Sequence, residues 1–361
     1  MRWPSRWSWP SPVLRGLRVP VAITAAFVAG AGAMAVARSD GNPDDDAVRV
    51  AGPPAPAPDT TSADVGRRGV STYVEMKNVD FHVGPEIVLH IRNLRGTMRS
   101  RSARHIVFDD KSSFVIRINT AEVGLTAEDL TRLLNTWTFA YPGAPIRSLK
   151  LRIEGNELVQ TGRLRKGVSL PFEIRSTVDL TPAGEIRIHA TRTRILGVGV
   201  GRLMRAFRIE LDDVLDLRKS RGARVEDNDI ILDVSRAIPP PAIEGHLTRV
   251  HIEGNQLVQH FGPMPQDAGF TVRSKPDGKA KNYMFYRGGV LQFGKLVMLD
   301  ADLQIVDLDP SDPFRFDIDR YDRQLVAGYS RTLGDLGLET FMKDLDDSPA
   351  LRASTVRTAR R

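Results

Sequence analysis

The stretch Leu149-Lys150-Leu151-Arg152-Ile153-Glu154-Gly155-Asn156-Glu157-Leu158-Val159-Gln160 decides the fold of this chain. Its first half alternates apolar and charged side chains, and this period of two is typical of a β-strand with one buried face. The Gly155-Asn156 pair then fits a tight two-residue turn, because glycine accepts a positive φ. The stretch therefore predicts a β-hairpin.

This hairpin motif recurs in the chain. Ile153 to Gln160 is repeated as Ile252-Glu253-Gly254-Asn255-Gln256-Leu257-Val258-Gln259, with seven of eight positions identical. A looser copy runs from Val225 to Leu232. Seven identities favour duplication or a shared structural demand over chance convergence, and the spacing is too long for a solenoid period. We therefore expect the copies to form similar edges of one large sheet.

Other segments carry the same period of two and predict further strands. The apolar positions of these strands are Val79, Phe81, Val83, Ile87, Leu89, Ile91, Phe114, Ile116, Ile118, Phe172, Ile174, Val178, Leu180, Ile186 and Ile188. Gly84-Pro85 and Pro182-Ala183-Gly184 separate neighbouring strands and predict two more hairpin turns.

Three segments predict helices between or after the strands. Thr126 is a good N-cap, and the apolar stripe Leu130, Leu133, Leu134 and Trp137 follows it at helical spacing. A glycine-led segment at 200–207 and a segment within 332–345 also carry helix-like apolar spacing. Short helices cannot cover a sheet of ten or more strands, so the sheet either curls around a helix or leaves its concave face to an apolar ligand.

The fold class that follows is α+β, mainly β, with a long curled antiparallel sheet wrapped around one or two helices and an N-terminal transmembrane helix. Residues 19–37 are an uncharged run of 19 residues. As a helix this run is about 28 Å long, close to the roughly 30 Å hydrocarbon core of a bilayer. Arginines precede the run and aspartates follow it, which predicts a cytoplasmic N-terminus.

The domain organisation that we expect has five parts. Residues 1–18 form a basic cytoplasmic tail, and 19–37 form either a transmembrane anchor or a signal segment cleaved after a small-x-small triplet. Residues 38–70 form a disordered linker rich in proline and aspartate. Residues 71–330 form a β-rich lipid-binding-like domain, in which 262–330 is an unassigned extension of the sheet, and 331–361 form a C-terminal helix and a basic tail. The expected location is the inner membrane, with one membrane crossing and the main domain outside the cytoplasm.

Several classes of function lack their sequence signals. The chain has no cysteine, which excludes disulfides and thiolate catalysis. It contains neither a Gly-x-Ser-x-Gly elbow nor a phosphate-binding loop, and its 7 histidines are scattered. The aspartates crowded into 300–322 match no calcium loop and more simply face water. We therefore expect no enzyme activity, no cofactor, no metal and no nucleic-acid partner.

Two groups of side chains are candidates for contact with lipid. The candidates for an apolar groove come from the predicted helix stripe and the glycine-led segment: Leu130, Leu133, Leu134, Trp137, Leu196, Val198, Val200, Leu203, Met204 and Phe207. The candidates for phosphate headgroups are arginines, whose guanidinium forks match phosphate oxygens: Arg92, Arg95, Arg99, Arg101, Arg104, Arg202 and Arg205. Plain core packing is the alternative for the first group, and a solvated surface is the alternative for the second.

The region from about Ile146 to Gly262 resembles the LmeA-like family of bacterial extracytoplasmic phospholipid-binding proteins. The matching features are Leu125-Thr126-Ala127-Glu128-Asp129-Leu130, Leu151 to Val159, Leu196-Gly197-Val198-Gly199-Val200, and Pro239-Pro240-Pro241 leading into Ile243-Glu244-Gly245. The resemblance implies a tubular lipid-binding-like fold, in which a curled sheet and a helix enclose an acyl-chain tunnel. The chain after Gly262 departs from that pattern.

These observations together predict a membrane-anchored lipid-binding protein. It would hold or transfer a phospholipid or a lipid-linked envelope intermediate in an apolar groove, with the membrane and envelope proteins as further partners. The alternative is a non-enzymatic envelope scaffold with a filled core and a protein partner. A third reading is a hydrolase that acts on envelope lipids.

Overall fold

The computed structural model describes residues 71–84, 86–102, 105–166, 168–195, 216–267 and 269–348. The predicted membrane segment, the linker, the helix at 200–207 and the basic C-terminal tail lie outside these residues. In the described part of the chain, every helix falls short of the length and apolar character that a bilayer crossing needs.

The largest sheet has eleven strands. Nine of them follow one another in the order β12 (His246–Glu253), β13 (Gln256–Gly262), β4 (Phe114–Thr126), β2 (Ile87–Ser100), β1 (Ser71–Val83), β14 (Tyr283–Arg287), β17 (Asp302–Asp307), β20 (Leu338–Met342) and β19 (Tyr329–Thr332). The other two pair in parallel: β11 (Ala242–Glu244) with β4, and β18 (Phe314–Asp317) with β1.

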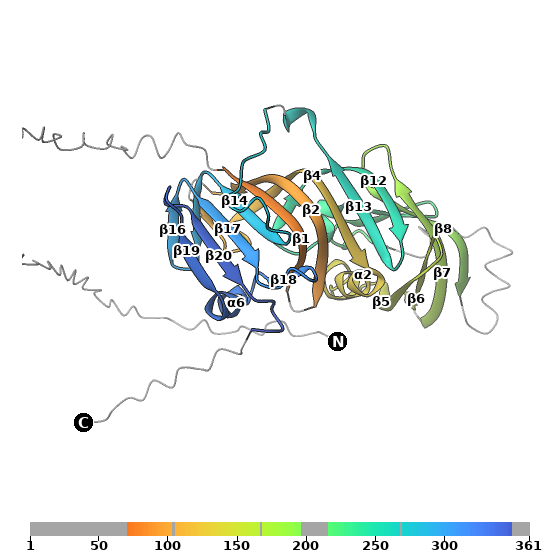
Figure 1. Cartoon of the computed structure of the whole chain (residues 1–361). Helices are drawn as coiled ribbons and strands as arrows, with labels where there is room; N and C mark the ends of the chain where they lie inside the picture. Colours follow the sequence, from red (N-terminus) through yellow and green to blue (C-terminus); the bar gives the residue numbers. More distant parts are fainter. Residues whose placement is uncertain are drawn as a thin grey trace, which may run out of the picture. The chain divides into compact units, whose positions relative to one another are not determined.

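Two smaller sheets and five short helices complete the described fold (Figure 1). The six-stranded sheet has the order β5 (Ile146–Glu154), β6 (Glu157–Lys166), β7 (Val168–Leu180), β8 (Ile186–Ile195), β10 (Asp229–Leu232) and β9 (Ala223–Glu226). The three-stranded sheet has the order β16 (Leu296–Leu299), β15 (Val290–Phe293) and β3 (Ile106–Val107). The helices are α2 (Ala127–Leu133), the π-helix η1 (Leu134–Thr138), α5 (Val234–Ala237), the 3-10 helix η2 (Pro265–Asp267) and α6 (Tyr321–Ala327).

The described fold is mainly β, as the sequence predicts, but its strands form three sheets and some pairs are parallel. Besides the two parallel pairs above, β15 pairs in parallel with β3, and β17 with β20. The expectation of one long antiparallel sheet was therefore too simple. The alternation of apolar and polar residues and the turn residues determine where each strand forms. Contacts between distant segments determine which strands become neighbours.

The repeated octapeptides form the predicted hairpins, at the edges of two different sheets. Glu154 pairs with Glu157 across the turn between β5 and β6, and Glu253 pairs with Gln256 across the turn between β12 and β13. Both turns have a left-handed glycine, with φ of 61° at Gly155 and 59° at Gly254. Strands β5 and β12 are edge strands, and so is β9, in the looser third copy.

The other predicted hairpins are also confirmed. Strands β1 and β2 pair from Val83 opposite Ile87 at the turn, and β7 and β8 pair from Leu180 opposite Ile186. In each of these strands the alternate apolar side chains face the core, as the alternation of apolar and polar residues in the sequence predicts.

Helix α2 begins where the sequence predicts. Thr126 is its N-cap, and the side chains of Thr126 and Asp129 bond reciprocally to each other's backbone N–H groups. The helix packs against β5 of the six-stranded sheet and against β2 and β4 of the eleven-stranded sheet. Figure 1 shows α2 beside β5 at the lower end of β4. It therefore connects the cores of the two sheets.

The C-terminal helix predicted within 332–345 is wrong. Strands β19 and β20 occupy this region as a hairpin, and β20 also pairs with β17. Gly334 and Gly337 lie in the turn, where they disfavour a helix, and Thr340 and Phe341 favour a strand. The apolar residues that suggested a helix lie in different elements: Leu333 and Leu336 come before β20, with Leu336 87 % exposed, Phe341 is in β20, and Leu345 follows it.

Irregular positions in the middle of the eleven-stranded sheet bend it. Asn78 in β1 has a φ of 51°, and the register between β2 and β4 shifts at Ile91/Asn93 and at Arg95/Gly96. Such bulges increase the local twist of a strand pair. Gly96 lies so close to β4 that a Cβ atom there would be 2.2 Å from the carbonyl oxygen of Arg117. These bends lie next to the cleft described below.

Candidate functional site

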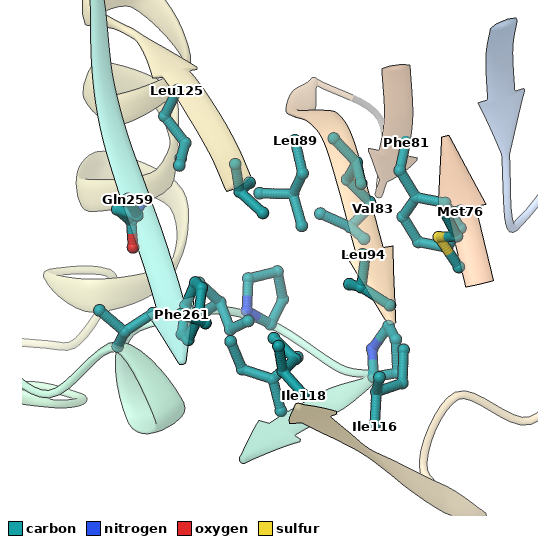
Figure 2. Close-up of a pocket in the computed structure, with 17 residues that line it drawn as sticks. Met76, Phe81, Val83, Leu89, Leu94, Ile116, Ile118, Leu125, Gln259 and Phe261 are labelled. Atoms are coloured by element: carbon teal, nitrogen blue, oxygen red, sulfur yellow. The ribbon is translucent and has the colours of Figure 1, made fainter. Parts of the chain in front are cut away.

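An apolar cleft lies on the inner face of the eleven-stranded sheet. Figure 2 shows side chains from different strands converging on a common space. The cleft is lined by Met76, Phe81, Val83, Leu89, Ile91, Leu94, Ile116, Ile118, Val123, Leu125, Val234, Ile238, Pro239, Pro241, Ile243, Gln259 and Phe261. Sixteen of these seventeen side chains are apolar, so the cleft suits a hydrocarbon ligand.

Two layers build this cleft. The inward-facing residues of β1, β2, β4 and β13 form one wall, because alternate side chains of a strand point to the same face. The segment from Val234 to Ile243 forms the other wall, held to the sheet where β11 pairs with β4. Pro239 and Pro241 lie in this segment, and the peptide bond between Pro240 and Pro241 is cis.

The cleft is a narrow slot. Its enclosed volume is about 60 Å³, and the rest of the hollow opens to the solvent at its mouth. This volume is well below that of typical small-molecule sites, roughly 300–1,000 Å³. The walls of the cleft therefore lie close together.

Gln259 is the one polar side chain among the lining residues. It is 4 % exposed, and its side-chain oxygen is buried with no hydrogen-bond partner in the described part of the chain. Figure 2 shows it on β13, between Leu125 and Phe261 in the view. Buried polar groups in proteins are nearly always hydrogen-bonded. The oxygen of Gln259 is therefore an unused hydrogen-bond acceptor in the wall of the cleft.

A second, more polar hollow adjoins the cleft and shares Val234, Ile243 and Phe261 with it. Its empty space is about 730 Å³ to the solvent, and Glu185, Asp233 and Ser235 supply its polar side chains. No lysine or arginine is among its lining residues, although Glu185 is paired with Arg224 at 2.6 Å. The hollow therefore presents mainly hydrogen-bond acceptors to a group that leaves the cleft on that side.

The groove candidates of the helix stripe lie in the core. Leu130, Leu133 and Leu134 are buried at 5–7 % exposure, Trp137 packs against the same core, and none of the four lines this cleft. The guanidinium of Arg221 stacks on the Trp137 ring, 4.3 Å from its centroid. The remaining groove candidates, Leu196, Val198, Val200, Leu203, Met204 and Phe207, lie outside the described residues.

The headgroup candidates fall into different environments. Arg92 forms ion pairs with Glu122 at 2.6 Å and with Glu253 at 2.8 Å, and Arg95 lies 3.4 Å from the buried carboxylate of Glu75. Arg99 and Arg101 are exposed, and neither forms an ion pair with any residue that the structure describes. Arg104, Arg202 and Arg205 lie outside the described residues.

An exposed apolar strand lies at the same end of the sheet as Arg99. Strand β16 has one edge without a partner strand in the described fold, and Leu296, Val297 and Leu299 on it are 46 %, 47 % and 68 % exposed. Ser71 on β1 pairs with Arg99 on β2, and the backbone of Ser71 packs against Gly289. The carbonyl of Gly289 accepts a hydrogen bond from the backbone N–H of Asp300, the residue that follows β16. Arg99, the first described residue of the chain and the end of β16 are therefore neighbours.

Other polar clusters have structural partners. Asp317 is 1 % exposed and pairs with Arg320 at 2.6 Å, and Asp307 accepts a hydrogen bond from Asn282 at 2.9 Å. Burial raises the pKa of Asp307 to about 6. Within the described ranges, no three histidine, aspartate or glutamate side chains gather as a metal site would require.

No protein-family model matches the chain, and no curated protein and no solved structure is significantly similar to it. The site is therefore argued from its own geometry. The sequence predicted the strands that supply Phe81, Leu89 and Ile118, but it did not place these residues in a cleft. The signal that was available is the apolar face of each strand, together with the proline run 239–241 that packs across it.

Proposed function

We propose that this protein is a membrane-anchored, extracytoplasmic lipid-binding protein that holds one apolar chain of a phospholipid or of a lipid-linked envelope intermediate. The observation that carries the proposal is the narrow cleft between the eleven-stranded sheet and residues 234–243. Its walls are apolar over sixteen side chains, and its width suits a hydrocarbon chain.

Burial alone supplies enough free energy for this function. Each buried CH₂ group contributes roughly 0.8 kcal/mol, so six to eight groups contribute about 5–6 kcal/mol before the cost of ordering the chain. An apolar slot loses contacts along its lining when it holds no ligand. A slender apolar ligand restores those contacts, and no catalytic step is needed.

For the finer architecture we propose the arrangement that the resemblance implies. In the proposed arrangement, the bent strands β1, β2, β4 and β13 curl around the bound chain, and α2 closes the end next to the six-stranded sheet. The run Pro239-Pro240-Pro241, one of the features that carry the resemblance to LmeA-like proteins, supplies two side chains of the cleft wall. This supports a lipid ligand over a filled core.

We further propose that the end of the fold near Ser71 rests on an anionic lipid surface. Arg99 and Arg101 carry charge that no described carboxylate neutralises, and β16 exposes three large apolar side chains at that end. Basic and apolar side chains together are what an anionic membrane surface binds. The chain reaches Ser71 from the predicted membrane segment, so a tether would hold this weak contact at high local concentration.

Native mass spectrometry of the full-length protein after mild detergent extraction tests the function. The expected spectrum shows a lipid adduct, and Ile118→Trp, which places an indole in the cleft, lowers its occupancy at least tenfold. Ile174→Trp is the matched control, because Ile174 is equally buried but lies in the six-stranded sheet, away from the cleft. A bare monomer in the wild type would instead support the envelope scaffold, and turnover of added lipid would support a hydrolase.

A further inference from the structure

Gln259 has an internal counterpart elsewhere in the same chain. The two copies of the octapeptide place Gln160 on β6 and Gln259 on β13 at the same position of the repeat. Both side chains are 4 % exposed, and each follows a Leu-Val pair that is also buried. The two glutamines therefore occupy matching backbone sites in different sheets, and their surroundings can be compared directly.

In the first copy the glutamine is satisfied. The side-chain nitrogen of Gln160 donates a hydrogen bond to the hydroxyl of Ser176 at 3.1 Å, and Ser176 is itself 1 % exposed. Ser176 lies on β7 directly opposite Leu158, two residues before the glutamine. A hydroxyl at this cross-strand position thus accepts a hydrogen bond from the carboxamide nitrogen inside the core.

In the second copy a leucine replaces that hydroxyl. Leu125 on β4 lies directly opposite Leu257, which is the position that Ser176 takes opposite Leu158. Leu125 cannot form a hydrogen bond, and the side-chain oxygen of Gln259 has no partner among the described residues. Both Leu125 and Gln259 line the apolar cleft. The hydroxyl is therefore missing at the point where the second copy faces a ligand site.

An unpaired buried carboxamide destabilises the empty fold, and an apolar side chain of similar size would not. We propose that the ligand of the cleft is an apolar chain that carries a hydroxyl, and that this hydroxyl donates to the unpaired side-chain oxygen of Gln259. This inference rests on the proposed function of the cleft and names the class of its ligand. The neighbouring hollow, lined by Glu185, Asp233 and Ser235, offers further acceptors for hydroxyls.

Competition between two probes tests the inference. Delipidated full-length protein in detergent is mixed with equal amounts of 1-hexadecanol and its methyl ether, which has the same chain but no O–H. Native mass spectrometry then gives the ratio of the two adducts. Any difference in partition into detergent is common to all variants, so ratios are compared between variants. One buried hydrogen bond predicts a preference for the alcohol about ten- to a hundredfold greater in the wild type than in Gln259→Leu.

Two further variants serve as controls. Gln160→Leu removes the matching glutamine from the other sheet and should keep the wild-type ratio. Leu125→Ser gives Gln259 an internal partner and should reduce the preference for the alcohol. Thermal melts of the delipidated proteins give a second readout: Gln259→Leu should raise Tm because it removes an unpaired group, whereas Gln160→Leu should lower Tm because it leaves Ser176 unpaired.

The outcomes separate this inference from the function on which it rests. If the wild type binds both probes with the ratio seen in Gln259→Leu, the hydroxyl is not recognised, although the cleft still binds a chain. If Gln259→Leu lowers Tm, its carboxamide is satisfied in the empty protein and the inference is wrong. If the wild type binds neither probe, the lipid-binding function itself fails.

Discussion

The Nε2 atom of His90 lies 3.3 Å from the Oδ2 atom of Asp129, and this contact ties β2 to the first turn of α2. The other ring nitrogen of His90 lies 2.7 Å from Asp80 on β1. Because the imidazole is held between two carboxylates, of which Asp129 has the larger effect, the pKa of His90 is raised to about 9. Burial acts in the opposite direction at Asp129, yet its bonds to His90 and Thr126 keep the pKa of that carboxyl below its usual value.

The stability of the fold should therefore depend on the charge of His90. The pKa in the folded state, about 9, exceeds the ordinary value of 6.5, so the protonated ring stabilises the fold fully below pH 6.5. This contribution is lost as the pH rises from 6.5 to 9. We expect the Tm of the wild type to fall over this interval, and the Tm of His90→Gln to change less. Parallel Tm curves for the two proteins would contradict this role.

Gly96 should be required at the bend between β2 and β4. A Cβ atom there would lie 2.2 Å from the carbonyl oxygen of Arg117, and backbone cannot move aside as a side chain can. We expect Gly96→Ala to lower the free energy of unfolding by about 2 kcal/mol or more. Gly278→Ala is the control, since nothing lies within 4 Å of its Cβ position. Equal effects of the two substitutions in urea titrations would argue against a close approach at Gly96.

Glu75 should stabilise the outer face of the eleven-stranded sheet through its two tyrosine partners. Its carboxylate accepts hydrogen bonds from Tyr73 at 2.5 Å and from Tyr283 at 2.6 Å, and all three residues are buried. Burial acts to raise the pKa of Glu75, but these hydroxyls and Arg95 together lower the pKa below its usual value. Glu75→Leu leaves two buried hydroxyls unpaired, and we expect it to cost about 2–5 kcal/mol of stability.

The same cluster offers a matched control. Replacing both tyrosines with phenylalanine in the Glu75→Leu background removes the unpaired hydroxyls, so most of the lost stability should return. Denaturant unfolding of the single and triple variants measures this. A triple variant less stable than Glu75→Leu would show that the tyrosine hydroxyls have other partners.

The surface formed by Arg99, Arg101 and β16 should contact anionic lipid. Full-length protein in nanodiscs is suited to hydrogen exchange, and we expect the amides of residues 295–300 to exchange more slowly in anionic than in neutral nanodiscs. Each basic residue near an anionic surface contributes about 1 kcal/mol to the free energy of binding. The double substitution Arg99→Glu with Arg101→Glu should therefore abolish the difference in exchange rate between the two kinds of nanodisc.

A second pair of arginines controls for net charge. Arg165→Glu with Arg192→Glu changes the charge equally on exposed positions of the six-stranded sheet. This variant should keep the difference between the two kinds of nanodisc. If β16 exchanges equally in both nanodiscs in the wild type, or if protein–protein pairing protects β16 without lipid, the surface is not a lipid contact.

The sequence by itself determined the local elements. Period two and a left-handed glycine specify the hairpins around Gly155 and Gly254, and a capping box specifies the start of α2. These signals act over a few residues, so they can be recognised without knowledge of the rest of the chain. They fail where apolar residues of a turn and a strand happen to fall at helical spacing, as with Leu333, Leu336 and Phe341 in the β19–β20 hairpin, which was predicted as a helix.

Only the tertiary structure decided which elements meet. The cleft joins Met76 on β1 to Phe261 on β13, and no local pattern relates residues so far apart. The surroundings of Gln160 and Gln259 also depend on the tertiary structure, because the octapeptides that contain them are almost identical. Strand pairing places Ser176 opposite Leu158, where it binds Gln160, but places Leu125 opposite Leu257, the matching position next to Gln259. Such pairing depends on packing summed over whole sheets, and therefore the cleft is a property of the assembled fold.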